Sequence, residues 1–215
     1  MGRTDAQFDF DPRRGGAREV PIPSCAASKD IRVLVPLVIV TGPPGAGKTT
    51  VARRLAEAAE RGVHLEADSF WHFIRSGWVP PWLPESHKQN EVVTDVIASA
   101  ALGYALGGYA VVVDGIVGPW FLDRFVGPLI EKQVPVRYVV FRPDWATALG
   151  RATARGTGAL TDTEPIRKMY NEFCNLGLHE ANALDSTGMT IEETVAAVVR
   201  GLADGHFALP DTVDT

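Results

Sequence analysis

The stretch that decides the fold reads Gly42-Pro43-Pro44-Gly45-Ala46-Gly47-Lys48-Thr49 and matches the pattern G-x-x-x-x-G-K-[ST] at every fixed position. An apolar run from Val33 to Thr41 precedes it, and a run with helical spacing from Thr49 to Arg61 follows it. A strand, a glycine-rich turn and a helix in this order are the setting in which the pattern binds phosphate. This setting disfavours the alternative, a glycine-rich turn that contains Lys-Thr by chance.

The chemistry of this loop follows from its residue types. Glycines let the backbone curl so that several N–H groups point at one anion, and the start of a helix adds partial positive charge. Lys48 is placed to reach the outer phosphates, and the Thr49 hydroxyl is a ligand for Mg²⁺. The sequence therefore predicts a site for ATP and Mg²⁺. The loop residues expected to contact the nucleotide are Gly42, Pro43, Pro44, Gly45, Ala46, Gly47, Lys48, Thr49 and Thr50.

Composition limits the class of protein. A chain of 215 residues with 46% hydrophobic residues suits one α/β domain. The formal net charge of −5 weighs against a nucleic-acid partner, which needs a basic face. Two cysteines, Cys25 and Cys174, supply neither a disulfide framework nor a metal cluster. The longest apolar run is interrupted by Pro36 and is too short to span a bilayer. We expect a cytoplasmic protein without a membrane partner, either a monomer or a weak homodimer.

Three regions follow from the change of composition along the chain. Residues 1–32 mix Arg, Gly, Pro and Asp without periodicity and lack the apolar core of a secretory signal, so we interpret them as a flexible arm. Residues 33–204 form the predicted domain, and residues 205–215 form a short tail. Within the domain the patterns indicate strands over 33–41, 63–67, 109–113 and 136–141, and helices over 48–61, 91–107, 143–155, 165–176 and 190–202. Another helix carries the stripe Phe121, Phe125 and Leu129, and a capping box at Thr190 opens the last one.

Strands that alternate with helices predict a doubly wound parallel sheet with right-handed crossovers. Ligands bind at the carboxyl ends of the strands in such a sheet. The phosphate-binding loop, Asp68, Asp114 and Arg142 all follow strands in this reading. Their shared position at one edge is stronger evidence for a site there than any one of them alone.

Two aspartates at this edge have chemical interpretations. Asp68 follows the second strand, where a carboxylate would orient an acceptor hydroxyl and take its proton. The alternative is that Asp68 caps the segment that begins at Ser69. Asp114 ends an apolar strand, as does the carboxylate that holds the Mg²⁺ shell together with Thr49. The alternative here is a simple Asp-Gly turn.

Arginines flank a short glycine-containing loop. Arg151 and Arg155 lie four residues apart and share one helix face, and Arg167 begins the next helix. Arginines beside a hinged loop suit a lid that closes on phosphates and compensates transition-state charge, so we expect a lid over residues 151–167. A solvated charged face is the alternative.

Aromatic residues and prolines gather in residues 70–90, the most individual segment of the chain. An aromatic wall with a polar rim suits a small molecule that has a ring-shaped or apolar body and hydroxyl groups. The alternative is that the rings only pack a long connection against the sheet. The acceptor-binding residues predicted here are Phe70, Trp71, Phe73, Trp78, Trp82, Gln89 and Asn90.

Together these motifs resemble the small P-loop kinases of metabolites and antibiotics. The resemblance rests on Gly42–Thr49, on Glu66-Ala67-Asp68-Ser69-Phe70, on Val113-Asp114-Gly115 and on the pair Arg151 and Arg155. Chloramphenicol phosphotransferase, gluconate kinase and shikimate kinase are similar types, within the nucleoside-monophosphate-kinase-like fold. The resemblance covers about residues 33–202 and supports Asp68 as the base for the acceptor hydroxyl.

This resemblance carries further expectations. It implies a five-stranded sheet of order 2-3-1-4-5, with adenine between Arg151 and the stretch that contains Ser186 and Thr187. The chain also departs from the group. Glu66 stands where shikimate kinase has a second aspartate, and Trp71 stands where polynucleotide kinases have an arginine. The second departure, together with the acidic balance, counts against a nucleic-acid acceptor.

The sequence thus predicts an ATP- and Mg²⁺-dependent O-phosphotransferase that acts on a hydroxyl of a small molecule, either an antibiotic or a metabolite. In this mechanism Lys48, Asp68, Arg151 and Arg155 are catalytic, and Thr49 and Asp114 hold the metal. Two alternatives stay open. One is a nucleotide-sugar kinase of the zeta-toxin type. The other is a nucleotide-dependent protein that sequesters a drug or lipid-like compound without phosphorylating it, with the tunicamycin-resistance ATP-binding protein as its nearest example.

Overall fold

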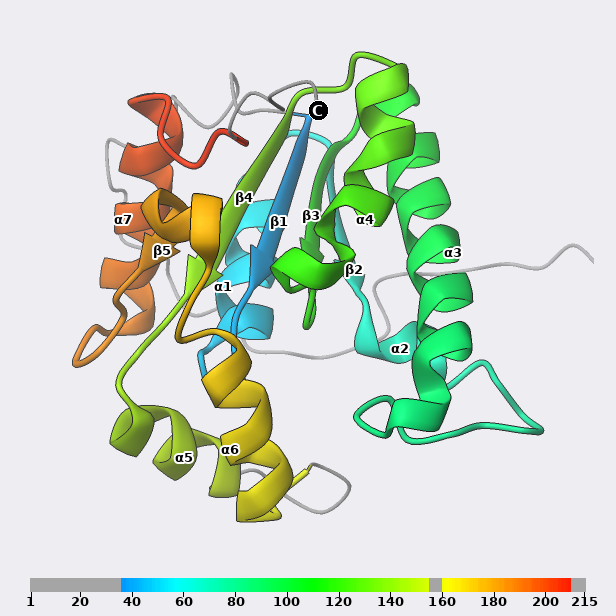
Figure 1. The fold of residues 1–215 in the computed structure, drawn as a ribbon. Helices are drawn as coiled ribbons and strands as arrows, with labels where there is room; N and C mark the ends of the chain where they lie inside the picture. Colours follow the sequence, from blue (N-terminus) through cyan, green and yellow to red (C-terminus); the bar gives the residue numbers. More distant parts are fainter. Residues whose placement is uncertain (1–35, 155–159, 210–215) are drawn as a thin grey trace, which may run out of the picture.

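The computed structural model describes residues 36–154 and 160–209. Five parallel strands form one sheet in the order β2-β3-β1-β4-β5 (Figure 1). The strands are β1 (Leu37–Thr41), β2 (Gly62–Glu66), β3 (Ala110–Asp114), β4 (Val136–Phe141) and β5 (Ala183–Leu184). This arrangement confirms the predicted parallel sheet and its order.

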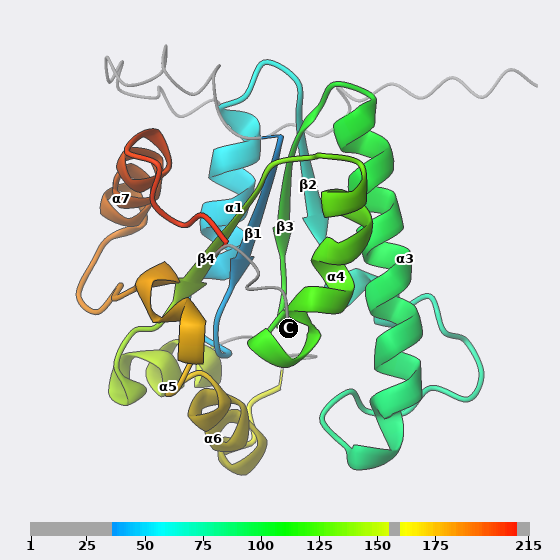
Figure 2. The ribbon, with the colours of Figure 1, turned by 45° about the horizontal axis from the view of Figure 1, so that its top comes forward.

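Helices cover both faces of the sheet and its carboxyl edge. Helices α3 (His87–Leu106) and α4 (Pro119–Glu131) lie on one face, and α1 (Lys48–Glu57) and α7 (Ile191–Ala203) lie on the other (Figures 1 and 2). The short helix α2 (Asp68–Trp71) follows β2, and α5 (Trp145–Thr153) and α6 (Thr163–Glu172) follow β4. Two 3₁₀ turns, η2 (Pro84–Ser86) and η3 (Gly177–Asn182), precede α3 and β5.

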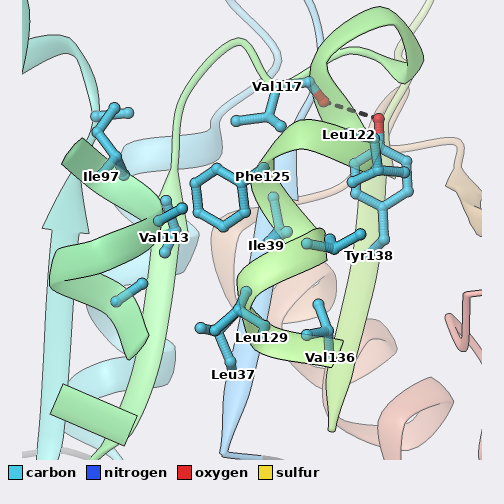
Figure 3. Packing of buried hydrophobic residues seen from close by; sticks show 14 of the residues in the cluster. Leu37, Ile39, Ile97, Val113, Val117, Leu122, Phe125, Leu129, Val136 and Tyr138 are labelled. Atoms are coloured by element: carbon cyan, nitrogen blue, oxygen red, sulfur yellow. Dashed lines mark hydrogen bonds between the residues drawn. The ribbon is translucent and has the colours of Figure 1, made fainter. Parts of the chain in front are cut away.

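The alternation of side chains along buried strands gives the sheet two apolar faces. Towards α3 and α4 the core contains Leu37, Ile39, Val113, Phe125 and Tyr138, which are at most 1% exposed (Figure 3). The Tyr138 hydroxyl donates to the carbonyl oxygen of Val117 at 2.8 Å, and this hydrogen bond fixes the loop between β3 and α4 to strand β4. Burial raises the pKa of this phenol. Towards α1 and α7 a second cluster contains alternate strand residues: Val38, Val40, Val112, Val139 and Phe141.

Several helices and strands begin or end at other residues than the sequence predicts. Helix α1 ends at Glu57 rather than at Arg61, and Gly62 opens β2 instead of closing the helix. A side chain at Gly62 would meet the Ala56 carbonyl oxygen at 1.8 Å, which explains why the chain has a glycine where β2 passes close to α1. Helix α3 begins four residues earlier than predicted, directly after the turn at Pro84–Ser86.

The ends of the domain were predicted in part. The capping box at Thr190 is confirmed: its hydroxyl accepts from the Glu193 N–H and the Glu193 carboxylate accepts from the Thr190 N–H. These hydrogen bonds hold the pKa of Glu193 below its usual value. The predicted arm, residues 1–32, lies outside the described residues. In the described part of the predicted tail, Phe207 is buried and its carbonyl accepts from the Tyr138 N–H at 2.9 Å. Within residues 36–154 and 160–209, no helix has the length and apolarity needed to cross a membrane.

Candidate nucleotide and acceptor site

The phosphate-binding loop lies at the carboxyl end of β1, between the central strand and the first turn of α1. Gly45 and Gly47 have φ angles of 81° and 89°, a left-handed conformation that residues with a side chain rarely adopt. Gly47 precedes α1 directly, so the loop ends where the free N–H groups of the first helical turn begin. A loop of this shape at a helix N-terminus is an anion site, and it fits a nucleotide phosphate chain.

Lys48 is held against the loop that it follows. It is only 6% exposed, and its ammonium donates to the carbonyl oxygens of Gly42 at 2.9 Å and Pro43 at 3.0 Å. The charge is therefore stationed beside the glycine-rich turn, where an outer phosphate would bind.

Thr49 and Asp114 meet at the end of β3. The Thr49 hydroxyl donates to Asp114 Oδ2 at 2.6 Å, although 65 residues separate the two in the chain. Asp114 is 2% exposed and is the last residue of β3. Hydroxyl and carboxylate oxygens are the ligands that Mg²⁺ prefers, so this pair fits a Mg²⁺ ion that is also bound by nucleotide phosphates. Among the described residues, no cluster of three or more His, Cys, Asp or Glu side chains offers another metal site.

His64 completes this arrangement, although no motif in the sequence marks it as part of a site. It lies on β2, and its Nε2 atom contacts Asp114 Oδ1. The signal that identifies it is the sheet register, in which His64 pairs with Val112 and so lies two residues from the level of Asp114. Sequence alone does not give this register.

Asp68 has a different environment. It is the exposed first residue of α2, and its side chain makes no hydrogen bond or ion pair with the residues that the structure describes. The Ala67 N–H donates to the Asp114 carbonyl at 2.8 Å, which fixes the start of α2 beside the end of β3. The alternative is that Asp68 caps the segment that begins at Ser69, but no side-chain hydrogen bond caps the start of α2 among the described residues. Asp68 is thus an exposed carboxylate next to the Thr49–Asp114 pair along the sheet edge.

On the other side of the loop, Arg151 meets the turn that follows β5. The Arg151 guanidinium donates to the Met189 carbonyl at 3.3 Å. Thr187 accepts from the Asp144 N–H at 2.7 Å and so ties this turn to the start of α5. Next to it an open cavity of about 440 Å³ is lined by Thr187, Gly188, Met189, Glu193, Ala196 and Arg200. The resemblance placed adenine near these elements.

Ser186 lies in the same turn and is 1% exposed, and its hydroxyl has no hydrogen-bond partner among the described residues. Arg155 and the neighbouring lid loop lie outside the described residues. Arg142 ends up at the predicted edge, but its guanidinium forms two hydrogen bonds with Glu180, at 3.2 and 2.9 Å. These bonds lower the pKa of Glu180.

The predicted acceptor segment separates into two parts. Gln89 and Asn90 hold the connection between α2 and α3 in place: Gln89 exchanges two hydrogen bonds with the Val79 backbone, and Asn90 accepts from Trp71 Nε1 at 2.9 Å. Phe70 and Phe73 form an edge-to-face pair with ring centres 5.6 Å apart. Trp78 and Trp82 are partly exposed on the connection, 43% and 37%.

An apolar groove of about 400 Å³ lies between α2 and α3, with Phe70, Phe73, Ile74, Lys88, Gln89, Val92, Val93 and Val96 as its lining. Of the predicted acceptor residues, the groove contains Phe70, Phe73 and Gln89, whereas Trp71, Trp78, Trp82 and Asn90 do not line it. The structure therefore does not bring the seven residues together into one wall.

Solved structures with the same fold include several kinases. A sugar kinase from Janibacter sp. HTCC2649 is 18% identical with a TM-score of 0.60, covering 79% of this chain and 95% of that one. The tunicamycin resistance protein of Deinococcus radiodurans is 16% identical with a TM-score of 0.60, covering 82% and 99%. Shikimate kinase from Acinetobacter baumannii is 22% identical with a TM-score of 0.53, covering 83% and 98%. At these identities the likeness establishes the fold.

No curated protein sequence matches the chain significantly. The sequence profile of the AAA domain (AAA_33) does match, over residues 37–173, which span the sheet from β1 to β4, the phosphate-binding loop and the Thr49–Asp114 pair. This match covers more than half of the chain. The chain therefore belongs to the AAA domain family of P-loop proteins.

Proposed function

We propose that this protein is an ATP- and Mg²⁺-dependent O-phosphotransferase whose acceptor is a hydroxyl group of a small molecule. One observation carries the proposal: Asp68 is exposed, its carboxylate has no hydrogen-bond or ion-pair partner among the described residues, and it lies at the same sheet edge as a phosphate-binding loop with a hydrogen-bonded Thr49–Asp114 pair. A carboxylate in this position has free acceptor capacity for the hydroxyl of a phosphoryl acceptor. The structural likeness to sugar and shikimate kinases supports the same reading.

In this mechanism the protein holds the acceptor hydroxyl next to the γ-phosphate of ATP and removes the proton of that hydroxyl. The loop N–H groups and Lys48 bind the β- and γ-phosphates of ATP. Thr49, with Asp114 behind it, would hold a Mg²⁺ ion, which would supply positive charge at the phosphates. Asp68 accepts a hydrogen bond from the acceptor hydroxyl and takes its proton as the acceptor oxygen bonds to the γ-phosphorus. The bond from that phosphorus to the bridging oxygen breaks, and ADP leaves with the electron pair.

Arginine supplies the remaining charge compensation. Arg151 lies on the last turn of α5, beside the turn that follows β5. From this position it contributes positive charge at the nucleotide, and we assign the same role to Arg155 and to the lid over residues 151–167. Ser186 and Thr187 contribute to the nucleobase side of the site.

The acceptor enters from the side of α2 and α3. Phe70 and Phe73 supply an apolar surface two and five residues after Asp68, which favours an acceptor with an apolar or ring-shaped part next to its hydroxyl. Trp71, Trp78, Trp82, Gln89 and Asn90, which lie at the two ends of the connection between α2 and α3 or within it, stay candidates for acceptor contacts. Antibiotics and hydroxylated metabolites both satisfy this description.

The test is a screen for phosphorylated product. Purified protein, ATP and Mg²⁺ are incubated with a panel of hydroxylated metabolites and antibiotics, and mass spectrometry detects any added phosphate. Asp68→Asn is expected to reduce transfer at least about 100-fold, the usual contribution of a general base, while ATP binding is retained. Lys48→Ala is expected to abolish transfer. Full activity of Asp68→Asn on an identified substrate would contradict the role of Asp68 as the base.

A sequestering protein is a second candidate, favoured by the mainly apolar groove between α2 and α3 and by the fold shared with a tunicamycin resistance protein. The same screen distinguishes the two. A sequestering protein binds a compound only when nucleotide is present and yields no phosphorylated product, whereas the proposed kinase yields product and ADP in equal amounts. Saturable binding of a nucleotide sugar, followed by its phosphorylation, would identify the zeta-toxin-type alternative.

A further inference from the structure

Asp114 divides its two carboxylate oxygens between two partners from different elements. Oδ2 accepts the hydroxyl proton of Thr49, from the first turn of α1, at 2.6 Å. Oδ1 is contacted by His64 Nε2, from the edge strand β2. The side chains of His64 and Asp114 are 17% and 3% exposed, so this contact is largely shielded from water. A nearly buried carboxylate is stable only when its oxygens are hydrogen-bonded, and both are.

The position of His64 follows from the sheet register. His64 pairs with Val112, and Glu66 pairs with Asp114, so His64 and Asp114 are diagonal neighbours on the same face of the sheet. This face is the one covered by α1, which carries Thr49. Three elements, α1 and the neighbouring strands β3 and β2, therefore each contribute one side chain to a series of contacts from Thr49 through Asp114 to His64.

The contacts from Thr49 through Asp114 to His64 can orient a metal ligand. A threonine hydroxyl that binds a metal through its oxygen must direct its proton elsewhere, and here the proton points to Asp114 Oδ2. If Oδ1 lost its donor, the carboxylate would be free to turn or to draw in water, and the Thr49 hydroxyl would lose its fixed orientation. Groups that orient metal ligands from behind commonly contribute about 10–100-fold to metal affinity.

We propose that His64 is a positioning residue that holds Asp114, and through it Thr49, in the orientation required to bind Mg²⁺ with the nucleotide. The inference rests on the proposed function in one respect, the assignment of Thr49 and Asp114 to the metal. It requires that the Nε2 atom of His64 carry a proton, which it donates to Oδ1. The role is distinct from packing, because it depends on the donor and not on the volume of the ring.

A matched pair of variants separates the two roles. His64→Gln and His64→Met replace the ring by side chains of nearly equal length and volume, and only glutamine offers an N–H donor at the reach of Nε2. Binding of Mn²⁺, as a probe for Mg²⁺, is measured by electron paramagnetic resonance in the presence of ADP. Binding of ATP in excess chelator is measured by calorimetry. Neither measurement depends on phosphoryl transfer.

His64→Met is expected to weaken Mn²⁺ binding about 10–100-fold. His64→Gln is expected to stay within about threefold of the unchanged protein, and metal-free ATP affinity is expected to be equal in all three proteins. The proposal is overturned if His64→Met binds Mn²⁺ like the unchanged protein, if His64→Gln is as weak as His64→Met, or if metal-free ATP binding falls in parallel. If the unchanged protein shows no nucleotide-dependent Mn²⁺ binding, both the role of His64 and the proposed function are overturned. If it binds Mn²⁺ normally but transfers no phosphate to any acceptor, only the proposed function is contradicted.

A measurement on the unchanged protein covers the case in which both variants fail to fold. Nitrogen-15 spectra of the imidazole rings show which nitrogen of His64 carries a proton. The proposal expects a protonated Nε2 whose signal shifts when Mg²⁺ and ADP are added and does not shift with ADP in chelator. An unprotonated Nε2, or an equal shift under both conditions, overturns it.

Discussion

The two aspartates of the site differ in what surrounds them, although both follow strands at the same edge. Asp114 is buried and hydrogen-bonded on both oxygens, whereas Asp68 is exposed and without a side-chain partner among the described residues. A buried carboxylate with fixed partners is held rigidly and suits a supporting role at a metal. An exposed carboxylate with free acceptor capacity suits contact with a substrate.

This contrast predicts that the same substitution lowers stability at Asp114 and leaves it almost unchanged at Asp68. In Asp114→Asn, the new NH₂ group faces a donor, either the Thr49 hydroxyl or His64, so one buried polar contact is lost. We expect the free energy of unfolding to fall by about 1–3 kcal/mol. Asp68→Asn, an exposed change, is expected to stay within about 0.5 kcal/mol. Urea unfolding without ligand measures both, and equal losses would show that the different surroundings of the two carboxylates have no energetic consequence.

Individual residues of the site could be predicted from the sequence only where the pattern around them is local. The loop from Gly42 to Thr49 and the position of Asp114 at the end of a strand are local patterns, so they are visible in one dimension. His64 lies 50 residues before Asp114 in the chain and becomes its neighbour only through the pairing of β2 with β3. The amides of Gln89 and Asn90 also hydrogen-bond within the connection before α3, and these bonds are not visible in the sequence.

At the scale of elements, sequence predicted which helices and strands exist better than where they end. Hydrophobic periodicity and proline positions identify each long element because burial repeats along it. The ends depend on contacts with other elements. Helix α1 stops four residues before the predicted end since β2 must start at Gly62, pressed against the Ala56 carbonyl. The two-residue strand β5 has too little pattern of its own and is defined by pairing with β4.

A contact between the phosphate-binding loop and α5 leads to the prediction at this scale. A side chain at Gly45 would lie 2.0 Å from the Ala148 carbonyl oxygen, whereas one at Gly47 would meet nothing within 4 Å. Both glycines have positive φ, so alanine costs backbone strain of about 1–2 kcal/mol at either position. Gly45→Ala also forces α5 and the loop apart and is expected to lose about 1–3 kcal/mol more.

Chemical denaturation of the two alanine variants checks this difference, with Gly47→Ala as the control for strain alone. Equal stability of Gly45→Ala and Gly47→Ala would show that α5 is not held against the loop. Because α5 carries Arg151, the same displacement is expected to weaken nucleotide binding in Gly45→Ala.

At the scale of the whole molecule, the phosphate-binding loop lies between two groups of helices. The loop after β1 lies between α2 with the start of α3 on one side and α5 with α6 on the other (Figure 1). The first pair offers Asp68 and the apolar groove, and the second offers Arg151 and the turn after β5. We expect a ligand bound in the loop to contact elements from both ends of the strand order, and its binding would then stabilise the entire folded domain.

This coupling gives the last prediction. A ligand that binds only the folded state at 100 times its dissociation constant stabilises it by about 2.7 kcal/mol. In a domain of this size each kcal/mol raises the melting midpoint by roughly 2–4 °C, so Mg²⁺ with ADP is expected to raise it by about 5–10 °C. Differential scanning fluorimetry measures the shift. Lys48→Ala removes the ammonium that is stationed beside the glycine-rich turn, so its shift at the same ADP concentration is expected to shrink to about 1 °C or less. An unchanged shift in Lys48→Ala would mean that ADP stabilises the domain from a site other than this loop.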